Sequence, residues 1–377
     1  MDKKPIPIFR LEYDSKFRKE FYRKCERIFD EGFLTNHSYV NEFERAFAEI
    51  LGLPYAIMTT SGTTALEAAL RAIPVRGKKV ILPTNAFIAC ADAIQSAGAE
   101  PLLVDIEPNR LGPDLQQVAK LLDQSVAAVM TIHIGGLISA EIVKLKALTA
   151  NAGVALIEDC AHAHGSSRGG MVAGGFGDLA AFSFHMTKSI TTGEGGAVVT
   201  NSPEWHSKLL SVRQFGKDLS EPLLHVREGS NFKVSEFVAL VGVMELARAQ
   251  SRIKRRQEIA SLYRTRLSKT PNIMVFGADR DSRCGHYKQI ITSSTGRGPF
   301  VGAFDEAKIA MTGGVYYYPL HKQPIMQNRV GNCSFPNSDW FADHHFCPPC
   351  YPELSDEEVH RICDVIDAVA QRKTPIS

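Results

Sequence analysis

Short apolar segments alternate with amphipathic segments along the chain from about residue 55 onward. Continuous apolar runs bounded by turn residues are typical of buried strands, whereas apolar residues three and four positions apart are typical of helices. These patterns predict strands at residues 55–58, 79–82, 101–106, 126–133, 154–158, 179–184 and 197–200. They predict helices at residues 61–72, 87–97, 113–122 and 140–150. Such alternation indicates an α/β fold with a mostly parallel sheet covered on both faces.

The pattern changes in the C-terminal third of the chain. The later predicted elements are a long helical stretch at 231–260, strands at 287–292 and 315–318, and a closing helix at 355–370. The basic run from Arg252 to Arg256 is interpreted as a solvated helix face rather than a nucleic-acid patch. Because 377 residues fit about two domains, we expect a large domain at residues 1–250 and a small C-terminal α/β domain at residues 251–377.

Charge and composition exclude several classes of protein. Lys and Arg number 43 and Asp and Glu 41, so the net charge of +2 provides no bulk attraction to nucleic acid or anionic lipid. The hydrophobic fraction of 44% fits a globular chain rather than a disordered one. No apolar run approaches the roughly 18 residues that span a bilayer, and the polar N-terminus lacks an apolar signal core. We therefore expect a cytoplasmic protein without membrane or nucleic-acid partners.

The 8 cysteines are scattered through the chain, which is typical of reduced thiols and not of a disulfide framework. Cys347 and Cys350 form the one close pair, with His344 and His345 nearby. A metal or redox role stays open for this pair, but no second Cys/His pair stands at a zinc-finger spacing. We therefore expect no metal site.

One lysine stands in an informative position. The predicted strand at 179–184 runs into a loop that holds Lys188, and a turn with Gly193, Gly195 and Gly196 follows. A lysine in a low-dielectric pocket has a lowered pKa, so its amine is available for a Schiff base with an aldehyde cofactor. Glycines let the backbone pass close to a cofactor or a partner chain. The alternative is an ordinary surface lysine in a flexible loop.

An acid follows another predicted strand. Asp159 stands at the end of a buried segment, where a carboxylate is costly unless it is paired. It can keep a pyridine ring nitrogen protonated, which makes the ring an electron sink. His162 can contact the ring or its phenolic oxygen. The alternatives are a strand-end Asp that caps the next turn and a structural histidine. His164 receives no role.

Two further features follow the first two strands. The turn with Gly62 and Thr63 opens a helix, and a free helix N-terminus binds anions. It is neither a Walker loop nor a dinucleotide fingerprint, and a simple helix cap is the alternative. Phe87 can stack on a flat cofactor ring or fill the core. Binding of pyridoxal phosphate (PLP) requires an activated lysine, an acid, an anion site and a stacking aromatic. All four candidates lie beyond strand ends of one predicted sheet.

Five blocks of the sequence extend this interpretation. They are Gly32-Phe-Leu-Thr with Glu42-Phe-Glu-Arg-Ala-Phe-Ala, Ser61-Gly-Thr-Thr-Ala-Leu, Ile157-Glu-Asp-Cys-Ala-His-Ala-His-Gly, Phe182-Ser-Phe-His-Met-Thr-Lys-Ser with Gly193-Glu-Gly-Gly, and Asn231-Phe-Lys-Val-Ser-Glu-Phe-Val-Ala-Leu-Val-Gly. In order and spacing the chain resembles the PLP-dependent sugar-nucleotide aminotransferases (DegT/StrS type), over about residues 33–366. The resemblance implies fold type I: a large PLP-binding domain with a mostly parallel, mixed seven-stranded sheet between helices, and a smaller C-terminal α/β domain. Ser189, Cys160 and the block at His133 depart from the family pattern without removing a catalytic group.

The resemblance also implies roles for individual residues. Lys188 would form the Schiff base and shuttle the proton, and Asp159 would pair with the ring nitrogen. The other implied cofactor contacts are His162, Phe87 as the stacking aromatic, Gly62, Thr63 and Ser183 at the phosphate, and Asn231 at the phosphate across a dimer interface. The active unit would therefore be a homodimer with shared active sites. His321 lies in a segment that resembles the substrate-side loop, so it is a candidate substrate contact.

The implied reaction is transamination. Glutamate would give its amino group to PLP, and the resulting pyridoxamine phosphate would aminate a 3- or 4-keto group of a nucleotide-linked deoxysugar for surface polysaccharide, such as O-antigen, or a glycosylated natural product. A dehydratase branch of the family carries His where this chain has Lys188, so transamination is favoured. Two alternatives stay open: a PLP aminotransferase acting on a cyclitol or other non-nucleotide ketone, and a non-catalytic PLP-binding regulatory protein.

Overall fold

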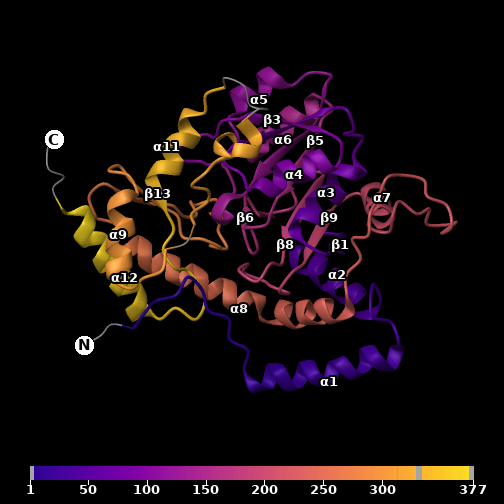
Figure 1. Cartoon of the computed structure of the whole chain (residues 1–377), viewed down its shortest axis with the longest axis horizontal. Coiled ribbons are helices and arrows are strands. Elements are labelled where there is room, and N and C mark those ends of the chain that lie inside the picture. Colours follow the sequence, from indigo (N-terminus) through magenta and orange to yellow (C-terminus); the bar gives the residue numbers. More distant parts are fainter. Residues whose placement is uncertain (1–3, 312, 328–332, 373–377) are drawn as a thin grey trace.

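The large sheet of the computed structural model has seven strands in the order β1-β9-β8-β5-β4-β2-β3 (Figure 1). Its strands are β1 (Tyr55–Thr59), β2 (Lys79–Pro83), β3 (Glu100–Val104), β4 (Val126–Ile132), β5 (Ala155–Asp159), β8 (Leu179–Ser183) and β9 (Gly196–Thr200). β9 pairs antiparallel with β1 and β8, and the other neighbours pair parallel. The mostly parallel, mixed sheet is therefore confirmed. The structure describes residues 4–311, 313–327 and 333–372.

Helices cover both faces of this sheet. Along β2, Val80 and Leu82 lie in one apolar cluster and Ile81 in another, and all three side chains are fully buried. Successive side chains of a strand point to opposite faces of the sheet, so a continuous apolar strand requires that both faces be covered. The covering helices are α2 (Ser38–Leu51), α3 (Gly62–Ala72), α4 (Ile88–Ser96), α5 (Leu115–Leu121), α6 (Ile142–Asn151) and α7 (Pro203–Arg213). The predicted alternation of strands and helices is confirmed to within a few residues.

A single long helix, α8 (Glu236–Arg266), runs from beside the large sheet into the C-terminal part of the chain (Figure 1). Helix α1 (Ser15–Glu31) packs along it. The sequence pattern did not predict α1 or α2. The predicted domain boundary between residues 250 and 251 falls inside α8, so the two predicted domains share this helix, and the division itself stays a prediction.

The C-terminal part is built around a three-stranded antiparallel sheet in the order β10-β12-β13. Its elements are β10 (Ile273–Val275), β12 (Ile291–Ser293), β13 (His345–Phe346), α9 (Gly298–Glu306), α11 (Pro336–His344) and α12 (Asp356–Ala370). A third apolar cluster, which includes Phe300, Phe304 and Phe346, packs this sheet against α9 and α12. The predicted closing helix is therefore confirmed.

Two predicted strands in this part need correction. Residues 315–318 form a turn, in which the Val315 N–H donates to His345 Nε2 at 2.8 Å instead of to a neighbouring strand. The predicted strand at 287–292 is limited to β12, because Tyr287 and Lys288 line a pocket before the strand begins. In both cases residues with strand propensity serve a site instead of a sheet.

The basic run of α8 is also not a solvated face. Arg252 Nη1 lies 2.8 Å from Glu353 Oε1, and Arg255 Nη2 lies 2.7 Å from Asp356 Oδ1. Arg256 is 5% exposed and donates to the carbonyl oxygens of Tyr287, at 3.3 Å, and of Cys350. The run therefore fastens α8 to the C-terminal part, and the earlier interpretation is wrong for these three arginines.

A third sheet links the two halves of the chain. It consists of β6 (Ser167–Arg168), β7 (Met171–Val172) and β11 (Ser282–Arg283), in the order β11-β6-β7. The pairing of β11 with β6 holds the segment that leads to Tyr287 beside the loop that follows β5. Within the described ranges, no helix combines the length and the apolar character needed to cross a bilayer.

Candidate active site

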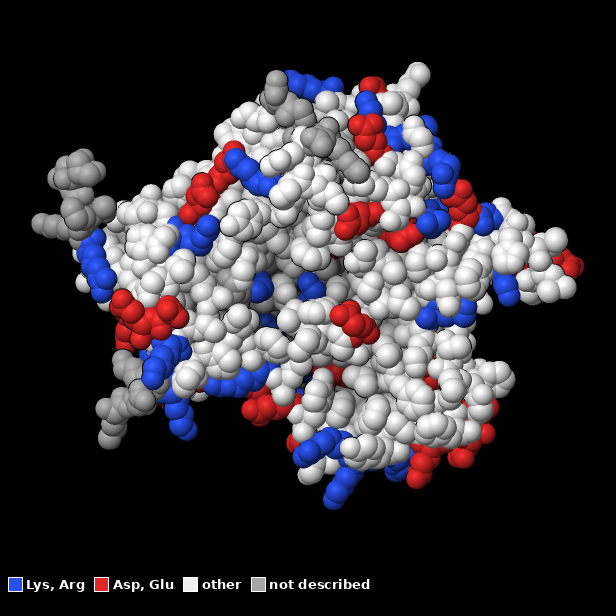
Figure 2. Space-filling model, in the orientation of Figure 1, with Lys and Arg blue, Asp and Glu red and all other residues white. Residues whose placement is uncertain are grey.

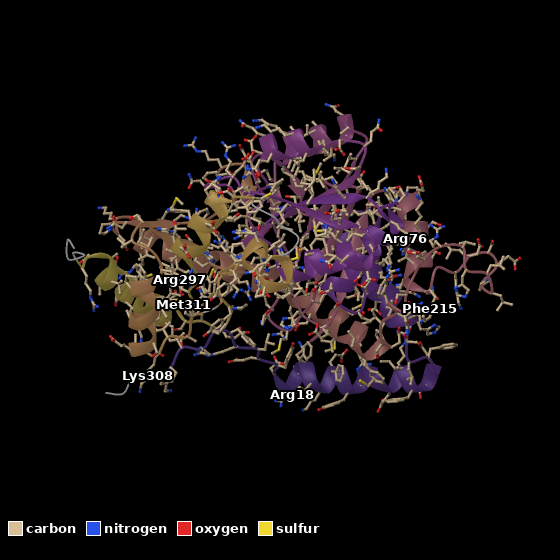
Figure 3. The ribbon with its side chains drawn as sticks, turned by 45° about the horizontal axis from the view of Figure 1, so that its top comes forward. Arg18, Arg76, Phe215, Arg297, Lys308 and Met311 are labelled. Atoms are coloured by element: carbon tan, nitrogen blue, oxygen red, sulfur yellow. The ribbon has the colours of Figure 1, made fainter. Side chains whose placement is uncertain are left out.

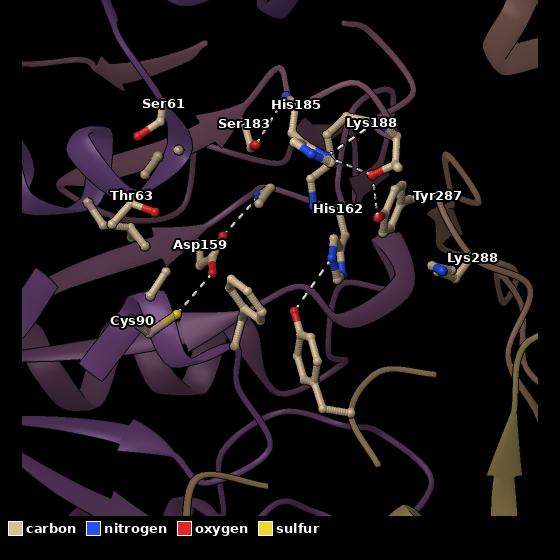
Figure 4. Close-up of a pocket in the computed structure, with 18 of the residues that line it drawn as sticks. Ser61, Thr63, Cys90, Asp159, His162, Ser183, His185, Lys188, Tyr287 and Lys288 are labelled. Carbon is tan, nitrogen blue, oxygen red and sulfur yellow. Dashed lines mark hydrogen bonds between the residues drawn. The ribbon is translucent and has the colours of Figure 1, made fainter. Parts of the chain in front are cut away.

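A pocket of about 510 Å³ lies at the carboxyl ends of β5 and β8 (Figure 4). Figure 2 shows a hollow near the centre of this face with basic side chains inside it, and the pocket is lined by Lys188 and Lys288. Seven of the nine predicted site residues line the pocket: Gly62, Thr63, Phe87, Asp159, His162, Ser183 and Lys188. The structure thus brings together residues spread over more than a hundred positions of the sequence.

The start of α3 forms an anion cradle. Ser61 Oγ accepts the Thr64 N–H at 3.1 Å, whereas Gly62 and Thr63 are the first helical residues, so their N–H groups lack an intrahelical acceptor. A Cβ atom on Gly62 would lie 2.7 Å from Ser183 Cβ. Glycine at this position therefore lets the Ser183 hydroxyl approach the helix terminus. Two N–H groups and one hydroxyl at a positive dipole end suit a phosphate group.

Asp159 ends β5 inside the pocket and is 6% exposed. Its Oδ1 accepts the Ala161 N–H at 2.9 Å, and its Oδ2 accepts the Cys90 S–H at 3.2 Å. Burial, and then the Asp159 charge, raise the pKa of the Cys90 thiol well above its usual value, so Cys90 stays a proton donor. The carboxylate is held at the pocket wall, where it can pair with a protonated ring nitrogen.

His162 and Phe87 supply flat surfaces to the pocket. The His162 ring stacks on Tyr287 with centroids 4.3 Å apart, and its Nδ1 accepts the Gly135 N–H at 3.3 Å. Burial, with the nearby charges of Lys188 and Lys288, holds the pKa of His162 well below its usual range, so the ring is neutral. Phe87 is 54% exposed, so the core-filler alternative is excluded and its ring is free to stack on a ligand.

Lys188 lies in the loop after β8, with its Nζ 4.3 Å from the centroid of the Tyr287 ring. Its neighbours in the loop face the pocket as well, because Thr187 and His185 also line it. The glycines that follow Lys188 were predicted to let the backbone pass close to a cofactor or a partner chain. At Gly196 the close neighbour is different, because a Cβ there would lie 2.1 Å from the Ser61 carbonyl oxygen. Gly196 therefore permits a close approach of β9 to the start of α3, within the same chain.

Asn231 and His321 are not brought into the pocket. Asn231 is exposed, and its Oδ1 accepts the Lys233 ammonium at 2.6 Å. His321 Nδ1 lies 2.7 Å from Thr84 Oγ1, and its Nε2 lies 2.9 Å from Asp339 Oδ1. These bonds make His321 a link between the end of β2 and α11. The roles of Asn231 across a dimer interface and of His321 at the substrate both stay predictions.

Sequence patterns missed several residues of this pocket, chiefly Cys90, Tyr287, Lys288 and Tyr316. Cys90 falls within a predicted helix of small apolar residues, so only its place one turn after Phe87 marks it. The other three come from the C-terminal half, and no periodicity connects them with strand ends of the large sheet. Only the folded chain brings them within reach of Lys188.

A group of potential metal ligands lies next to the pocket wall. Among the described residues, His133, Glu158 and Cys160 have ligand atoms within 4.8 Å of one another. The Glu158 carboxylate, however, accepts three backbone N–H groups, from Gly174, Phe176 and Gly177, and also lies 2.7 Å from His133 Nε2. Its lone pairs are occupied, so this group braces the strand end that carries Asp159. Cys347 and Cys350 are buried thiols.

Comparisons with known proteins agree with this geometry. Residues 15–367 match the DegT/DnrJ/EryC1/StrS aminotransferase family. The chain is 30% identical to GDP-perosamine synthase of Vibrio cholerae, over 96% of this chain and 98% of that protein. It is 30% identical to dTDP-4-dehydro-2,3,6-trideoxy-D-glucose 4-aminotransferase of Saccharopolyspora spinosa, over 85% and 86% of the two chains. A crystal structure of S. venezuelae DesV in complex with a ketimine intermediate superposes with a TM-score of 0.91 at 27% identity, covering 99% of this chain and 100% of that chain.

The residues of the pocket fit PLP. The cradle at Gly62 has room for a phosphate because no Cβ fills it, the acid at Asp159 lies at the pocket wall, and Lys188 reaches the same space. The match covers nearly the whole length of the chain. The chain therefore belongs to the DegT/DnrJ/EryC1/StrS aminotransferase family and is a PLP-dependent aminotransferase of fold type I.

Proposed function

We propose that the enzyme transfers an amino group from glutamate to a 3- or 4-keto group of a nucleotide-linked deoxysugar. The observation that carries this proposal is the convergence of Lys188, Asp159 and the α3 terminus in one pocket. The two relatives described above support the substrate class, because their names specify a GDP-linked and a dTDP-linked sugar. The product would be an amino sugar for surface polysaccharide, such as O-antigen, or for a glycosylated natural product.

Bound PLP supplies an electron sink that stabilises negative charge at the carbon next to the substrate nitrogen. The N–H groups of Gly62 and Thr63 and the Ser183 hydroxyl would hold its phosphate, and Asp159 would pair with its ring nitrogen. Phe87 and the neutral His162 would contact the ring. Lys188 Nζ would take a proton from one carbon and return it to another, as a general base and then a general acid.

Basic groups of the pocket support an anionic substrate. Lys288 lines the same pocket as Lys188, and its Nζ lies 5.5 Å from the Tyr287 ring centroid. A nucleotide-linked sugar carries a diphosphate, and glutamate carries two carboxylates. We propose that Lys288 binds one of these anionic groups, because a lysine ammonium is a point charge suited to phosphate and carboxylate.

We also propose a homodimer with shared active sites. The segment between α7 and α8 projects beyond α7 in Figures 1 and 3, and Phe215 marks its base. Its apolar side chains face solvent in the monomer, with Leu223 94%, Leu224 57% and Val226 50% exposed. Apolar surface of this kind indicates a protein partner, and a second copy would place Asn231 of one subunit at the phosphate cradle of the other. A cytoplasmic location stays a prediction.

The decisive experiment incubates the PLP-loaded enzyme with glutamate and a panel of GDP-, dTDP- and UDP-linked keto sugars, and detects the aminated product by mass spectrometry. The Lys188→Ala variant serves as the control. A cyclitol ketone in the same panel tests the alternative acceptor class. Amination of the cyclitol alone would overturn the nucleotide-sugar proposal, and PLP binding without any amino transfer would indicate a regulatory protein.

A further inference from the structure

A chain of polar side chains runs along the wall of the pocket from Tyr287 to His185 (Figure 4), and the exposed Glu194, at the rim of the same pocket, lies beyond His185. Tyr287 Oη lies 3.1 Å from Thr187 Oγ1, and Thr187 Oγ1 lies 3.0 Å from His185 Nδ1. On its other side, His185 Nε2 lies 3.8 Å from Glu194 Oε1. The inner end is next to the catalytic lysine, because Lys188 Nζ lies 4.3 Å from the Tyr287 ring centroid.

The hydrogen bonds of this chain share one direction. His185 Nδ1 is approached by the Thr187 hydroxyl and also by the Thr187 N–H, at 3.4 Å. Two donors at Nδ1 require a lone pair there, so the neutral ring carries its hydrogen on Nε2. Thr187 Oγ1 then donates to His185 and accepts from Tyr287. Every O–H of the chain therefore points outward.

The chain also runs from a dry environment to a wet one. At its outer end the His185 side chain is 41% exposed and the Glu194 side chain is 68% exposed. At its inner end, burial raises the pKa of Tyr287, but the charges of Lys188 and Lys288 oppose burial and help to lower the pKa overall. Tyr287 is therefore suited to exchange a proton with its lysine neighbour.

Amino transfer creates a need for such a path. Each half-reaction adds and removes protons at Lys188 Nζ. Cofactor and substrate together would displace water from a pocket of about 510 Å³. Side chains along the pocket wall would then offer protons a path to the exposed rim at His185 and Glu194.

We propose that Tyr287, Thr187 and His185 form a proton relay between Lys188 Nζ and bulk water. In the outward direction, the Lys188 ammonium moves from the face of the Tyr287 ring to Tyr287 Oη and gives it a proton, while the Tyr287 hydroxyl proton passes to Thr187 Oγ1. The Thr187 proton passes to His185 Nδ1, and His185 releases its Nε2 proton to water. One proton leaves Lys188, one appears in water, and no electron pair leaves the chain. The inward direction is the reverse.

This proposal rests on the amino-transfer function proposed above, but its first test needs no substrate. The visible band of the PLP-loaded enzyme reports the protonation of the Lys188 nitrogen, so a pH jump in a stopped-flow instrument measures how fast that nitrogen exchanges its proton. Thr187→Val keeps the shape of the side chain and removes the hydroxyl. We expect this variant to relax at least about tenfold more slowly than wild type, because one link of the path is missing.

Thr187→Ser is the matched control, since it keeps the hydroxyl, and it should relax within about twofold of wild type. His185→Ala is a second variant, which tests the relay even if Thr187→Val misfolds. It should relax slowly, and added imidazole should restore its relaxation rate, because the site of the His185 side chain is open to solvent. Equal relaxation of wild type, Thr187→Val and His185→Ala would overturn the relay. So would slow relaxation that neither serine nor imidazole restores, because the chain would then only order the loop.

A second measurement connects the relay to turnover. With glutamate deuterated at its α-carbon, Thr187→Val should retain severalfold more deuterium in recovered glutamate than wild type, because the abstracted deuteron leaves Lys188 more slowly. Unchanged retention would contradict the relay. If wild type exchanges no deuterium from glutamate, the proposed amino donor is wrong, and the pH jump alone decides the relay.

Discussion

The Sγ atom of Cys90 lies 3.2 Å from Oδ2 of Asp159, and the Cys90 side chain is fully buried. Because burial, and then the Asp159 charge, raise the pKa of the thiol well above its usual value, Cys90 keeps its proton and donates to the carboxylate. Asp159 is thereby oriented from one side by α4 and from the other by the Ala161 N–H. Cys90 is therefore a positioning residue for Asp159, the acid that we propose pairs with the cofactor ring.

Replacing Cys90 tests this orientation. Cys90→Ala removes the donor, and we expect the affinity of the apoenzyme for PLP to fall about tenfold, as a hydrogen bond to a charged group is worth about 1.5 kcal/mol or more. Cys90→Ser keeps a donor and should remain near wild type. Fluorescence titration with PLP measures both. Equal affinities of Cys90→Ala and wild type would show that Asp159 needs no support from α4.

Lys188→Ala should abolish the visible band, which lies near about 400 nm for such imines. Turnover should fall by roughly 100- to 10,000-fold, because the general base is lost. Absorption spectroscopy and the mass-spectrometric assay measure the two effects. A variant that retains both band and turnover would remove the central role given to this lysine.

Gly62→Ala should weaken PLP binding and lower stability by about 1–3 kcal/mol, since the new Cβ would lie 2.7 Å from Ser183 Cβ. Gly298→Ala is a matched control, because a Cβ at Gly298 meets nothing within 4 Å. Thermal unfolding with and without PLP separates the two effects. If both variants bind PLP as tightly as wild type, the close approach of α3 to Ser183 is not needed for the cradle.

Lys288→Ala should raise KM for the keto-sugar nucleotide or for glutamate by about tenfold with a smaller change in kcat, because a charge contact in the bound state is lost. The substrate whose KM rises is the one that Lys288 binds. Lys254→Ala, at an exposed position of α8, is the control and should leave both KM values unchanged. No rise in either KM would exclude Lys288 from substrate binding.

Burial lowers the pKa of His164 to about 4, and its Nε2 donates to the Ser183 carbonyl oxygen at 2.9 Å. The unfolded chain takes up this proton near its ordinary pKa of about 6.5, before the folded protein does. Stability is therefore full above that pH and falls as the pH drops towards 4, by up to about 3 kcal/mol. Urea unfolding should show this slope, and His164→Gln should reduce it by about one proton. Each free energy of unfolding is taken relative to the value for the same protein at pH 8, which removes any effect of the substitution on packing. An unchanged slope in His164→Gln would contradict the assignment of the pH dependence to His164.

Local pattern sufficed for the part of the site that follows strand ends. Gly62, Phe87, Asp159 and Lys188 each come shortly after a continuous apolar run, and parallel strands bring their carboxyl ends to one edge. Their grouping in one pocket was therefore predictable, and their chemical roles stay predictions. Helix α1, by contrast, packs along α8 through one face only, and its pattern was not recognised.

Residues that depend on contacts distant in sequence were beyond pattern reasoning. Residues 315–318 have the β-branched and aromatic character of a strand, but His345 takes the Val315 N–H and leaves Tyr316 facing the pocket. Arg256 has the sequence of a solvated face, yet carbonyl oxygens from two distant segments surround it. Propensity describes neighbours along the chain, whereas these positions are decided by partners 30 to 94 residues away.

The continuity of α8 limits how this enzyme can diversify. Each residue inserted into a helix turns everything beyond it by about 100° and advances it by about 1.5 Å. An insertion or deletion between Glu236 and Arg252 would thus swing the arginine anchors, and with them Tyr287, away from Lys188. Length variation among descendants of this chain should accumulate in surface loops, while the residue count of this helix stays constant.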